Sequence, residues 1–264
     1  MLLRVLRSCS SRRVLLGSRM ALYREDKDAK NMSVDIGGMR KPYKESTEAF
    51  TEDDLVSQEP IGQFAAWFNE ACQNLSIVES NAMCLATATK SGKPSARMVL
   101  LKCYGKDGFH FFTNYNSRKG QELAENPQAH LCFYWAQLMR QVRIEGRVEK
   151  LSEEESTEYF HTRPHGSQIA ACLSPQSQVI PNRSFLTDKD EQMREEYKDE
   201  TKLIPKPDCW GGFRVVPEVV EFWQGQSSRV HDRIRFRKVT AEENIDESMT
   251  KQGTDGWVYE RLAP

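Results

Sequence analysis

The sequence predicts a mainly β (α+β) fold in which an antiparallel barrel carries peripheral helices. Segments with the period of two that is typical of strands outnumber helical segments, and most neighbouring strand segments are joined by short turns. Neither a β-α-β repeat nor a Gly-x-Gly-x-x-Gly motif occurs. A closed antiparallel barrel surrounded by helices is therefore the expected architecture.

Size, charge and cysteine content narrow the class of protein. The 264 residues suffice for one large domain or two small ones. The net charge of −1 gives no whole-chain attraction to nucleic acid, and no apolar run approaches the roughly 18 residues of a membrane span, so neither partner is expected. The seven cysteines form no Cys-x-x-Cys pair, which predicts reduced thiols in a cytoplasmic setting and no metal site.

The N-terminus has an unusual composition. Residues 1–24 contain six arginines and no acidic residue, a pattern typical of mitochondrial transit peptides, although an unstructured tail would show it too. Residues 25–57 are polar and lack periodicity. We therefore expect a mobile arm at 1–57 and a single domain at 58–264, with a mitochondrial location as the alternative to a cytoplasmic one.

The first half of the domain reads as a helix followed by a meander. A helix is predicted near Pro60–Asn74, because apolar residues recur at helical spacing and the leading proline suits a first turn. A second, short helix at Arg118–Glu125 ends at Asn126-Pro127. The strands predicted between these helices are Ala82–Thr89, Ser95–Cys103 and Phe109–Thr113.

In the second half, Ser152 and Glu155 form a capping box that begins a helix, and Pro164 ends it near Arg163. Further helical segments are expected at about Ser167–Cys172 and Arg183–Asp199. Strands are expected at Ala129–Trp135, Arg140–Leu151, Trp210–Val216, Val219–Gln224, Val230–Lys238 and Trp257–Leu262, with a polar loop at Ala241–Asp255.

The most informative segment is Glu221–Arg233, which joins an aromatic run, a turn and several cations. Read as a strand, Arg229, His231 and Arg233 share one face with the two arginines that follow, whereas Val230, Ile234 and Phe236 face the other way. Such a face beside Trp223 suits a flat anionic aromatic ligand, since arginine both stacks on rings and binds phosphate. The alternative is an edge strand whose charges oppose aggregation.

Two other motifs predict phosphate binding. The segment Asn116–Gly120, Asn-Ser-Arg-Lys-Gly, lies where a strand gives way to a helix, whose N-terminus offers free N–H groups. Tyr159, Arg163 and Ser167 are spaced by four around Pro164, so they form a helix–break–helix corner. The alternative makes Tyr159 a core residue and Arg163 a cation at a helix end.

Three isolated polar residues are weaker candidates. Arg97 and Lys102 lie on opposite faces of one predicted strand, so they serve two different anions or one of them is solvated. The amide of Gln141 donates and accepts hydrogen bonds, which suits the edge of a flavin, although an ordinary surface amide would look the same.

The run Trp223-Gln224-Gly225-Gln226, the following Arg229 and His231-Asp232-Arg233, and the C-terminal Trp257–Pro264 resemble the pyridoxine (pyridoxamine) 5'-phosphate oxidase family. The resemblance extends from about Gly37 to Pro264. It implies a split β-barrel, bound FMN and a homodimer. It also implies oxidation of pyridoxine 5'-phosphate and pyridoxamine 5'-phosphate by dioxygen to pyridoxal 5'-phosphate and hydrogen peroxide.

The resemblance also assigns individual residues. Arg229 and His231 match residues over the ring of the substrate and are the predicted catalytic pair. The predicted substrate contacts are these two residues with Lys102, Tyr159, Arg163, Ser167, Arg40 and Tyr43. The predicted FMN contacts are Arg97, Met98, Val99, Leu100, Phe112, Thr113, Arg118, Lys119, Gln141, Gln176, Ser177, Trp223 and Arg233.

Two rival functions are considered. A flavin-binding split-barrel protein with another substrate would keep Arg97, Arg118 and Lys119, but it need not combine the corner around Pro164 with Arg229. A non-enzymatic nucleic-acid binder would use the basic strand, would lose affinity steeply with salt, and would be colourless.

Overall fold

The computed structural model describes residues 13–16, 19–23, 34–35, 43, 49–199, 201–240 and 243–264. The chain divides into two compact units, Met1–Tyr43 and Lys44–Pro264. In the first unit, β1 (Arg13–Leu16), β2 (Arg19–Tyr23) and β3 (Val34–Asp35) form a small antiparallel sheet. Arg40 and most of the arginine-rich N-terminus lie outside the described residues, so the substrate role of Arg40 and the targeting segment stay predictions.

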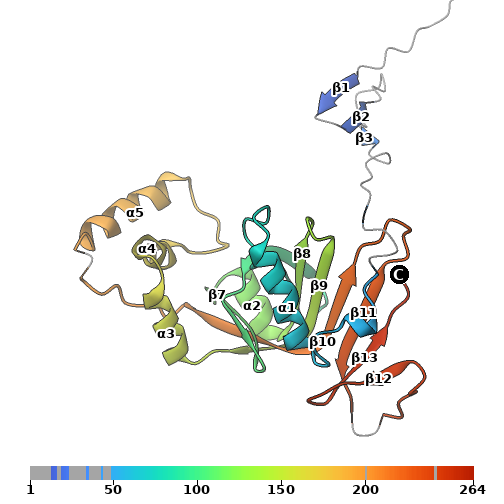
Figure 1. Cartoon of the computed structure of the whole chain (residues 1–264). Helices are drawn as coiled ribbons and strands as arrows, with labels where there is room; N and C mark the ends of the chain where they lie inside the picture. The colour runs from blue at the N-terminus through green and yellow to red at the C-terminus, as the bar shows by residue number, and fades with distance from the viewer. Residues whose placement is uncertain are drawn as a thin grey trace, which may run out of the picture. The chain divides into compact units, whose positions relative to one another are not determined.

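The larger unit is built on a ten-stranded antiparallel sheet with the order β12-β13-β11-β10-β9-β8-β4-β5, in which β7 pairs with both β10 and β6 (Figure 1). The strands are β4 (Ala82–Ala88), β5 (Pro94–Leu100), β6 (Cys103–Gly105), β7 (Gly108–Asn114), β8 (Gln128–Trp135), β9 (Arg140–Lys150), β10 (Trp210–Gln224), β11 (Asp232–Lys238), β12 (Thr250–Gln252) and β13 (Trp257–Arg261).

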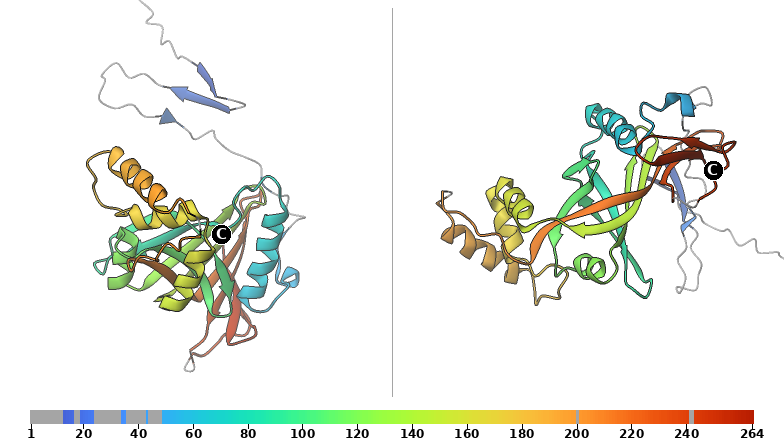
Figure 2. Two further views of the ribbon diagram at one scale, coloured as in Figure 1. Left: turned by 90° about the vertical axis from the view of Figure 1, so that its left-hand side faces the viewer. Right: turned by 90° about the horizontal axis from the view of Figure 1, so that it is seen from below.

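The helices of this unit are peripheral, as predicted. Helices α3, α4 and α5 gather at one end, and β11, β12 and β13 lie at the opposite end (Figures 1 and 2). Their bounds are α1 (Pro60–Gln73), α2 (Arg118–Glu125), α3 (Glu153–Thr162), α4 (His165–Leu173) and α5 (Ser184–Glu196), with a 3-10 turn at Glu52–Asp54. Within the described part of the chain, none of these helices is long and apolar enough to cross a membrane.

The predicted helix signals are confirmed in detail. Pro60 occupies the first turn of α1, and the side chain of Glu59 caps this helix by accepting hydrogen bonds from the first free N–H groups. Ser152 and Glu155 form the predicted capping box, with N–H···O distances of 3.0 and 2.8 Å. Helix α3 ends before Arg163, whose backbone is extended next to Pro164.

The 15-residue strand β10 organises the sheet. Its first half pairs with β7, its second half pairs with β11, and β9 runs along most of it across a register shift between Pro217 and Val219. We expected two strands here. The bulge absorbs the irregularity at Pro217 without ending the strand.

The expected closed barrel is wrong in one respect, because the sheet is split. Among the described residues, no ladder joins β5 to β7. Instead β5 ends at Leu100, and after a two-residue break the chain continues as β6, which pairs with β7. The bend at this point leaves an opening between β5 and β7, which is the split-barrel arrangement implied by the resemblance.

Two hydrophobic cores stabilise the larger unit. The first lies between α1 and the sheet, where the fully buried ring of Phe64 contacts Phe109 and Phe133 at centroid distances of 5.0 and 5.2 Å. The second lies under α3 and α4 and includes Phe160 and Trp210. Trp210 opens β10, so this second core ties the helical corner to the long strand.

Several boundaries differ from the prediction. The predicted strand Ser95–Cys103 ends at Leu100, which places Lys102 between strands β5 and β6. Strand β11 begins at Asp232, not at Val230, which is 65% exposed. The expected polar loop at 241–255 contains the short strand β12, which pairs with β13. Helix α4 begins at His165, two residues earlier than expected, because Pro164 suits the position before a helix.

Residues 49–57, which we assigned to the mobile arm, belong to the larger unit and make specific contacts with its sheet. The ring of Phe50 is buried, and its N–H donates to Asp232 Oδ2 at 3.0 Å. Arg261 binds Glu52 at 2.8 Å and Asp232 at 3.1 Å. This part of the chain is therefore bound to the end of the sheet at which β11 and β13 lie.

Candidate functional site

A cavity of about 580 Å³ opens at the split of the barrel. It is bounded by β5, by β7, by the start of α2 and by the corner between α3 and α4. The lining residues are Arg97, Met98, Val99, Leu100, Lys102, Phe112, Thr113, Lys119, Tyr159, Arg163, Pro164, Ser167, Gln176 and Trp210. Twelve of these were predicted site residues, so the fold unites predicted residues from four separate segments of the chain.

Lys119 is a buried cation in this cavity. Its Nζ donates to Thr113 Oγ1 at 3.0 Å and to Gln176 Oε1 at 2.7 Å, and no acidic side chain among the described residues pairs with it. Burial, with a smaller contribution from the Arg97 guanidinium, lowers the pKa of Lys119 to about 8. A buried ammonium without a carboxylate is costly unless an anion joins it.

Arg163 is a second cation without an acidic partner among the described residues, and its side chain is half-buried. Its guanidinium lies over the ring of Trp210, 4.7 Å from the centroid. Its Nη1 is buried and has no hydrogen-bond acceptor in the described structure. Burial lowers the pKa of Arg163, although arginine stays charged at physiological pH. An orphaned donor in a cavity is a feature that a bound anion would satisfy.

Arg97 and Arg118 differ from these two cations because both pair with the buried carboxylate of Glu122. Arg97 lies 3.4 Å from Glu122 and also donates to Thr87 Oγ1 at 2.6 Å, while Arg118 Nε lies 2.8 Å from Glu122. Burial alone would raise the pKa of Glu122, but hydrogen bonds from Ser95, Thr87 and Arg118 outweigh it and hold the pKa at about 2. The side chain of Arg118 is 54% exposed and does not line the cavity.

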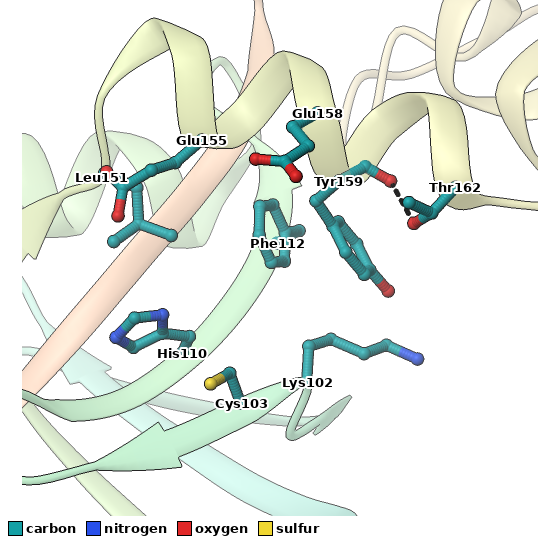
Figure 3. A pocket seen from close by; sticks show the side chains of 9 residues that line it. All are labelled: Lys102, Cys103, His110, Phe112, Leu151, Glu155, Glu158, Tyr159 and Thr162. Carbon is teal, nitrogen blue, oxygen red and sulfur yellow. Dashed lines mark hydrogen bonds between the residues drawn. The ribbon is translucent and has the colours of Figure 1, made fainter.

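One wall of the cavity is aromatic. The rings of Phe112 and Tyr159 stack at 3.9 Å between centroids. Both residues and Lys102 also line a smaller neighbouring cavity of about 240 Å³ (Figure 3). In Figure 3, the hydroxyl group of Tyr159 and the side chain of Lys102 lie on the same side of the stacked rings. The two neighbouring cavities therefore share an aromatic wall, formed by Phe112 and Tyr159, and the cation of Lys102.

A second group of predicted residues lies at the other end of β10. Trp223 pairs across the sheet with Gln141 on β9 and with Arg233 on β11. Trp210 and Trp223 are the first and next-to-last residues of β10. At about 3.3 Å per residue, they are roughly 40 Å apart along an uncurved strand. A single chain therefore does not bring this group to the cavity.

Arg229 and His231 are not on a strand face, which corrects the prediction. Arg229 has φ +70° in the turn that precedes β11, a conformation that side chains other than glycine rarely adopt. His231 packs against Trp223 at 4.9 Å between centroids, and its Nδ1 accepts a hydrogen bond from the N–H of Gln226 at 3.0 Å. The neutral ring therefore carries its proton on Nε2. Burial, followed by the charge of Arg229, lowers the pKa of His231.

The basic face of β11 is largely compensated by acids. Arg233, Arg235 and Arg237 do share one face, as predicted, with Ile234 and Phe236 buried on the other. Arg235 and Arg237 both pair with Glu260, Arg237 also with Glu243, and Arg233 pairs with Glu221. This pairing leaves little free charge for nucleic acid along the strand.

Sequence reasoning missed the acids that hold the arginines and the tryptophan beneath Arg163. Glu122 follows Arg118 by one helical turn, which is a signal that could have been read. Glu221 carries no such signal, because its partners Arg143 and Arg233 lie on the two neighbouring strands. Ser177 has φ +70° and lies beside Gln176 in the loop after α4. Its role, like that of Tyr43, stays a prediction.

The cavity can therefore hold an anion. It presents one buried and one half-buried cation that have no carboxylate partner among the described residues, together with a helix N-terminus and an aromatic wall. This combination suits a flat ligand carrying a phosphate. No group of three or more potential ligands for a metal ion occurs among the described residues.

Two comparisons with known sequences agree with this geometry. Residues 68–197 match the family described as pyridoxamine 5'-phosphate oxidase, and residues 210–264 match the pyridoxine 5'-phosphate oxidase C-terminal dimerisation region. The pyridoxine/pyridoxamine 5'-phosphate oxidase of Bombyx mori is 53% identical over 95% of this chain and 98% of that protein. The pyridoxine-5'-phosphate oxidase of Bos taurus is 55% identical over 89% and 90%.

Solved structures agree on the fold. PhzG from Burkholderia lata 383, in complex with tetrahydrophenazine-1-carboxylic acid, matches with a TM-score of 0.69 and 27% identity over 81% of this chain and 97% of that one. A pyridoxamine 5'-phosphate oxidase-related, FMN-binding protein from Nostoc punctiforme matches with a TM-score of 0.57 and 15% identity, over 79% of this chain and 100% of that one.

The pKa of Lys119 predicts a pH dependence of anion binding. Lys119 is charged below its pKa of about 8, so affinity for inorganic phosphate should be highest there and fall by up to about tenfold per pH unit above it. Isothermal titration of the ligand-free protein across this range measures the profile. Lys119→Met should bind phosphate weakly at every pH. An identical profile in both proteins would exclude Lys119 from the anion site.

Proposed function

This chain belongs to the pyridoxamine 5'-phosphate oxidase family, and from this premise we propose that it is an FMN-dependent oxidase of B6 vitamers. It oxidises pyridoxine 5'-phosphate and pyridoxamine 5'-phosphate to pyridoxal 5'-phosphate. Dioxygen accepts the electrons and becomes hydrogen peroxide. With pyridoxamine 5'-phosphate, one water is also consumed and the amine leaves as ammonia.

The cavity at the split of the barrel is the observation that carries this proposal. Twelve of its fourteen lining residues occupy positions that the family resemblance gives to FMN or to the substrate. The other two, Pro164 and Trp210, form the corner and the ring on which Arg163 rests. Two phosphates, one on the cofactor and one on the substrate, account for two cations that lack acidic partners.

We assign the cofactor phosphate to the side of the cavity near α2. Lys119 would neutralise it there, with Arg97 alongside and Arg118 at the rim. Gln176 and Thr113, which now bind Lys119, would turn to the ligand or keep the ammonium oriented. The substrate phosphate is assigned to the opposite side, to Arg163, Tyr159, Ser167 and Lys102.

When bound, FMN would supply the redox chemistry, as the acceptor of a hydride from C4' of the vitamer and the donor of electrons to dioxygen. The protein then has to orient and bind, and no nucleophilic side chain is needed. Arg229 would hold the substrate ring and favour developing charge. His231, neutral at physiological pH and protonated on Nε2, would act as its partner.

The enzyme is a homodimer, consistent with its match to the C-terminal dimerisation region of the family. We further propose that each site combines the cavity of one subunit with Trp223, Arg229, His231 and Arg233 of the partner subunit. The length of β10 supports this arrangement, because it separates the two groups within one chain. A two-fold dimer would then form two equivalent sites.

The purified protein should be yellow and should oxidise pyridoxine 5'-phosphate with one hydrogen peroxide formed per turnover. Acid release should give FMN, because the cavity offers charges for a single phosphate near α2. An absorption spectrum, chromatography of the released flavin and a peroxidase-coupled assay measure the three properties. Release of mainly riboflavin or FAD would contradict the assigned cofactor, and bound FMN without oxidation would contradict the assigned substrate.

Mixed dimers test the shared site. A heterodimer of an Arg163→Ala chain and an Arg229→Ala chain, purified through two different tags, contains one site with both arginines intact. Its activity at low substrate concentration should reach about half of the wild-type value, far above either variant homodimer. Activity equal to the average of the two homodimers would show instead that both arginines serve the same subunit.

The two arginines should also differ in kinetics. Arg229→Ala should lower kcat by about tenfold to a hundredfold while FMN stays bound, because positioning of the substrate ring is lost. Arg163→Ala should chiefly raise KM, by about tenfold or more, because it removes a phosphate bond made in the ground state and the transition state alike. Steady-state assays with saturating FMN separate the effects. If both variants raised KM equally and left kcat unchanged, Arg229 would only bind the substrate and would not position its ring.

A further inference from the structure

Glu221 is a buried acid at the second half of β10, and the proposed function gives it no part. Its carboxylate lies between arginines of the two neighbouring strands. Arg233 on β11 donates through Nε and Nη2 at 2.8 and 3.1 Å, and Arg143 on β9 donates through Nη1 at 3.1 Å. The side chain of Glu221 is 7% exposed, so solvent screens these contacts little.

The contacts leave Arg233 with one orientation. A guanidinium has five N–H groups. Two donate to Glu221, and Nη1 donates a third to the carbonyl oxygen of Ala263 at 2.7 Å. The backbone is held as well, since Leu262 N–H donates to the carbonyl oxygen of Arg233 at 2.9 Å. The two remaining N–H groups are on Nη1 and Nη2, and the bidentate pair fixes the plane in which they lie.

We propose that Glu221 is a positioning residue, which holds the guanidinium of Arg233 so that its two remaining N–H groups meet the flavin. This inference rests on the proposed function, which makes Arg233 an FMN contact. Glu221 itself would not touch the cofactor. It acts by preorganisation, because an arginine that is already ordered loses less rotational freedom when the ligand binds.

The same sheet face offers a matched control. Glu260 on β13 also binds two arginines, Arg235 and Arg237, and its side chain is 13% exposed. Neither arginine is a predicted ligand contact. Glu260→Gln should therefore lower the stability of the protein by breaking a comparable ion pair. Because Glu260 does not contact Arg233, this variant should leave the orientation of Arg233 unchanged.

The experiment compares Glu221→Gln with Glu260→Gln by titrating FMN into each flavin-stripped protein and following the quenching of flavin fluorescence. Glu221→Gln should weaken FMN binding by about tenfold, the scale of a charge-assisted hydrogen bond, and Glu260→Gln by less than about twofold. Thermal unfolding of both variants records the structural cost. Equal weakening in the two variants, or none in Glu221→Gln, would overturn the proposal.

A double-mutant cycle with Arg233→Gln separates positioning from a general loss of structure. If Glu221 acts through Arg233, adding Glu221→Gln to Arg233→Gln should change FMN affinity by less than about twofold. Independent, multiplying effects would show that Glu221 acts by another route.

Two further results keep the test decisive. If Glu221→Gln does not fold, Glu221→Asp keeps the buried charge but withdraws it from the guanidinium, and the same cycle is run with that variant. If the wild-type protein binds no FMN, the proposed function fails by itself. If FMN binds and Arg233→Gln leaves its affinity unchanged, the contact assigned to Arg233 is wrong, and with it the role of Glu221.

Discussion

The continuous pairing of strand β10 is the constraint on which the rest of the structure depends. This strand pairs with β7 along its first half, with β11 along its second half and with β9 along most of its length. A bulge after Pro217 lets the strand bend without losing its neighbours. Because Trp210 and Trp223 are fixed at its two ends, the two groups of functional residues are held apart by the sheet itself. In the function proposed above, the partner subunit of the homodimer brings the two groups together.

Five of the predicted ligand-binding cations fall into two kinds. Arg97, Arg118 and Arg233 are held by buried carboxylates, so each keeps a defined orientation even without a ligand. Lys119 is buried and Arg163 is half-buried, and neither has an acidic partner, so their desolvation is not offset within the described residues. The first kind provides geometry, and the second provides charge that an anion satisfies. A phosphate site needs both, since unpaired buried charge lowers stability and fully paired charge binds anions weakly.

Local signals predicted much of the architecture. The capping box at Ser152, the proline of α1 and the break at Pro164 act within one helical turn. They therefore fix where the helices begin and end without help from distant parts of the chain. The predicted strand boundaries were wrong where pairing with a neighbouring strand decides at which residue a strand begins. The segment after Gln224 alternates like a strand from Val230, but the turn that contains Arg229 occupies the space in which pairing would begin, so the ladder with β10 starts at Asp232.

By itself, the sequence determined the fold class, the chemical class of ligand and most of the residues that line the cavity. The fold class follows from periodicity and the phosphate-binding motifs from residues that are close along the chain, whereas most of the lining residues follow from the resemblance to the oxidase family. Only the tertiary structure decided that Lys119 and Arg163 have no acidic partner among the described residues, that Glu122 and Glu221 hold the neighbouring arginines, and that the residues around Trp223 lie far from the cavity. The physical reason is that burial and ion pairing depend on neighbours from distant strands, and no local pattern of residues encodes those neighbours.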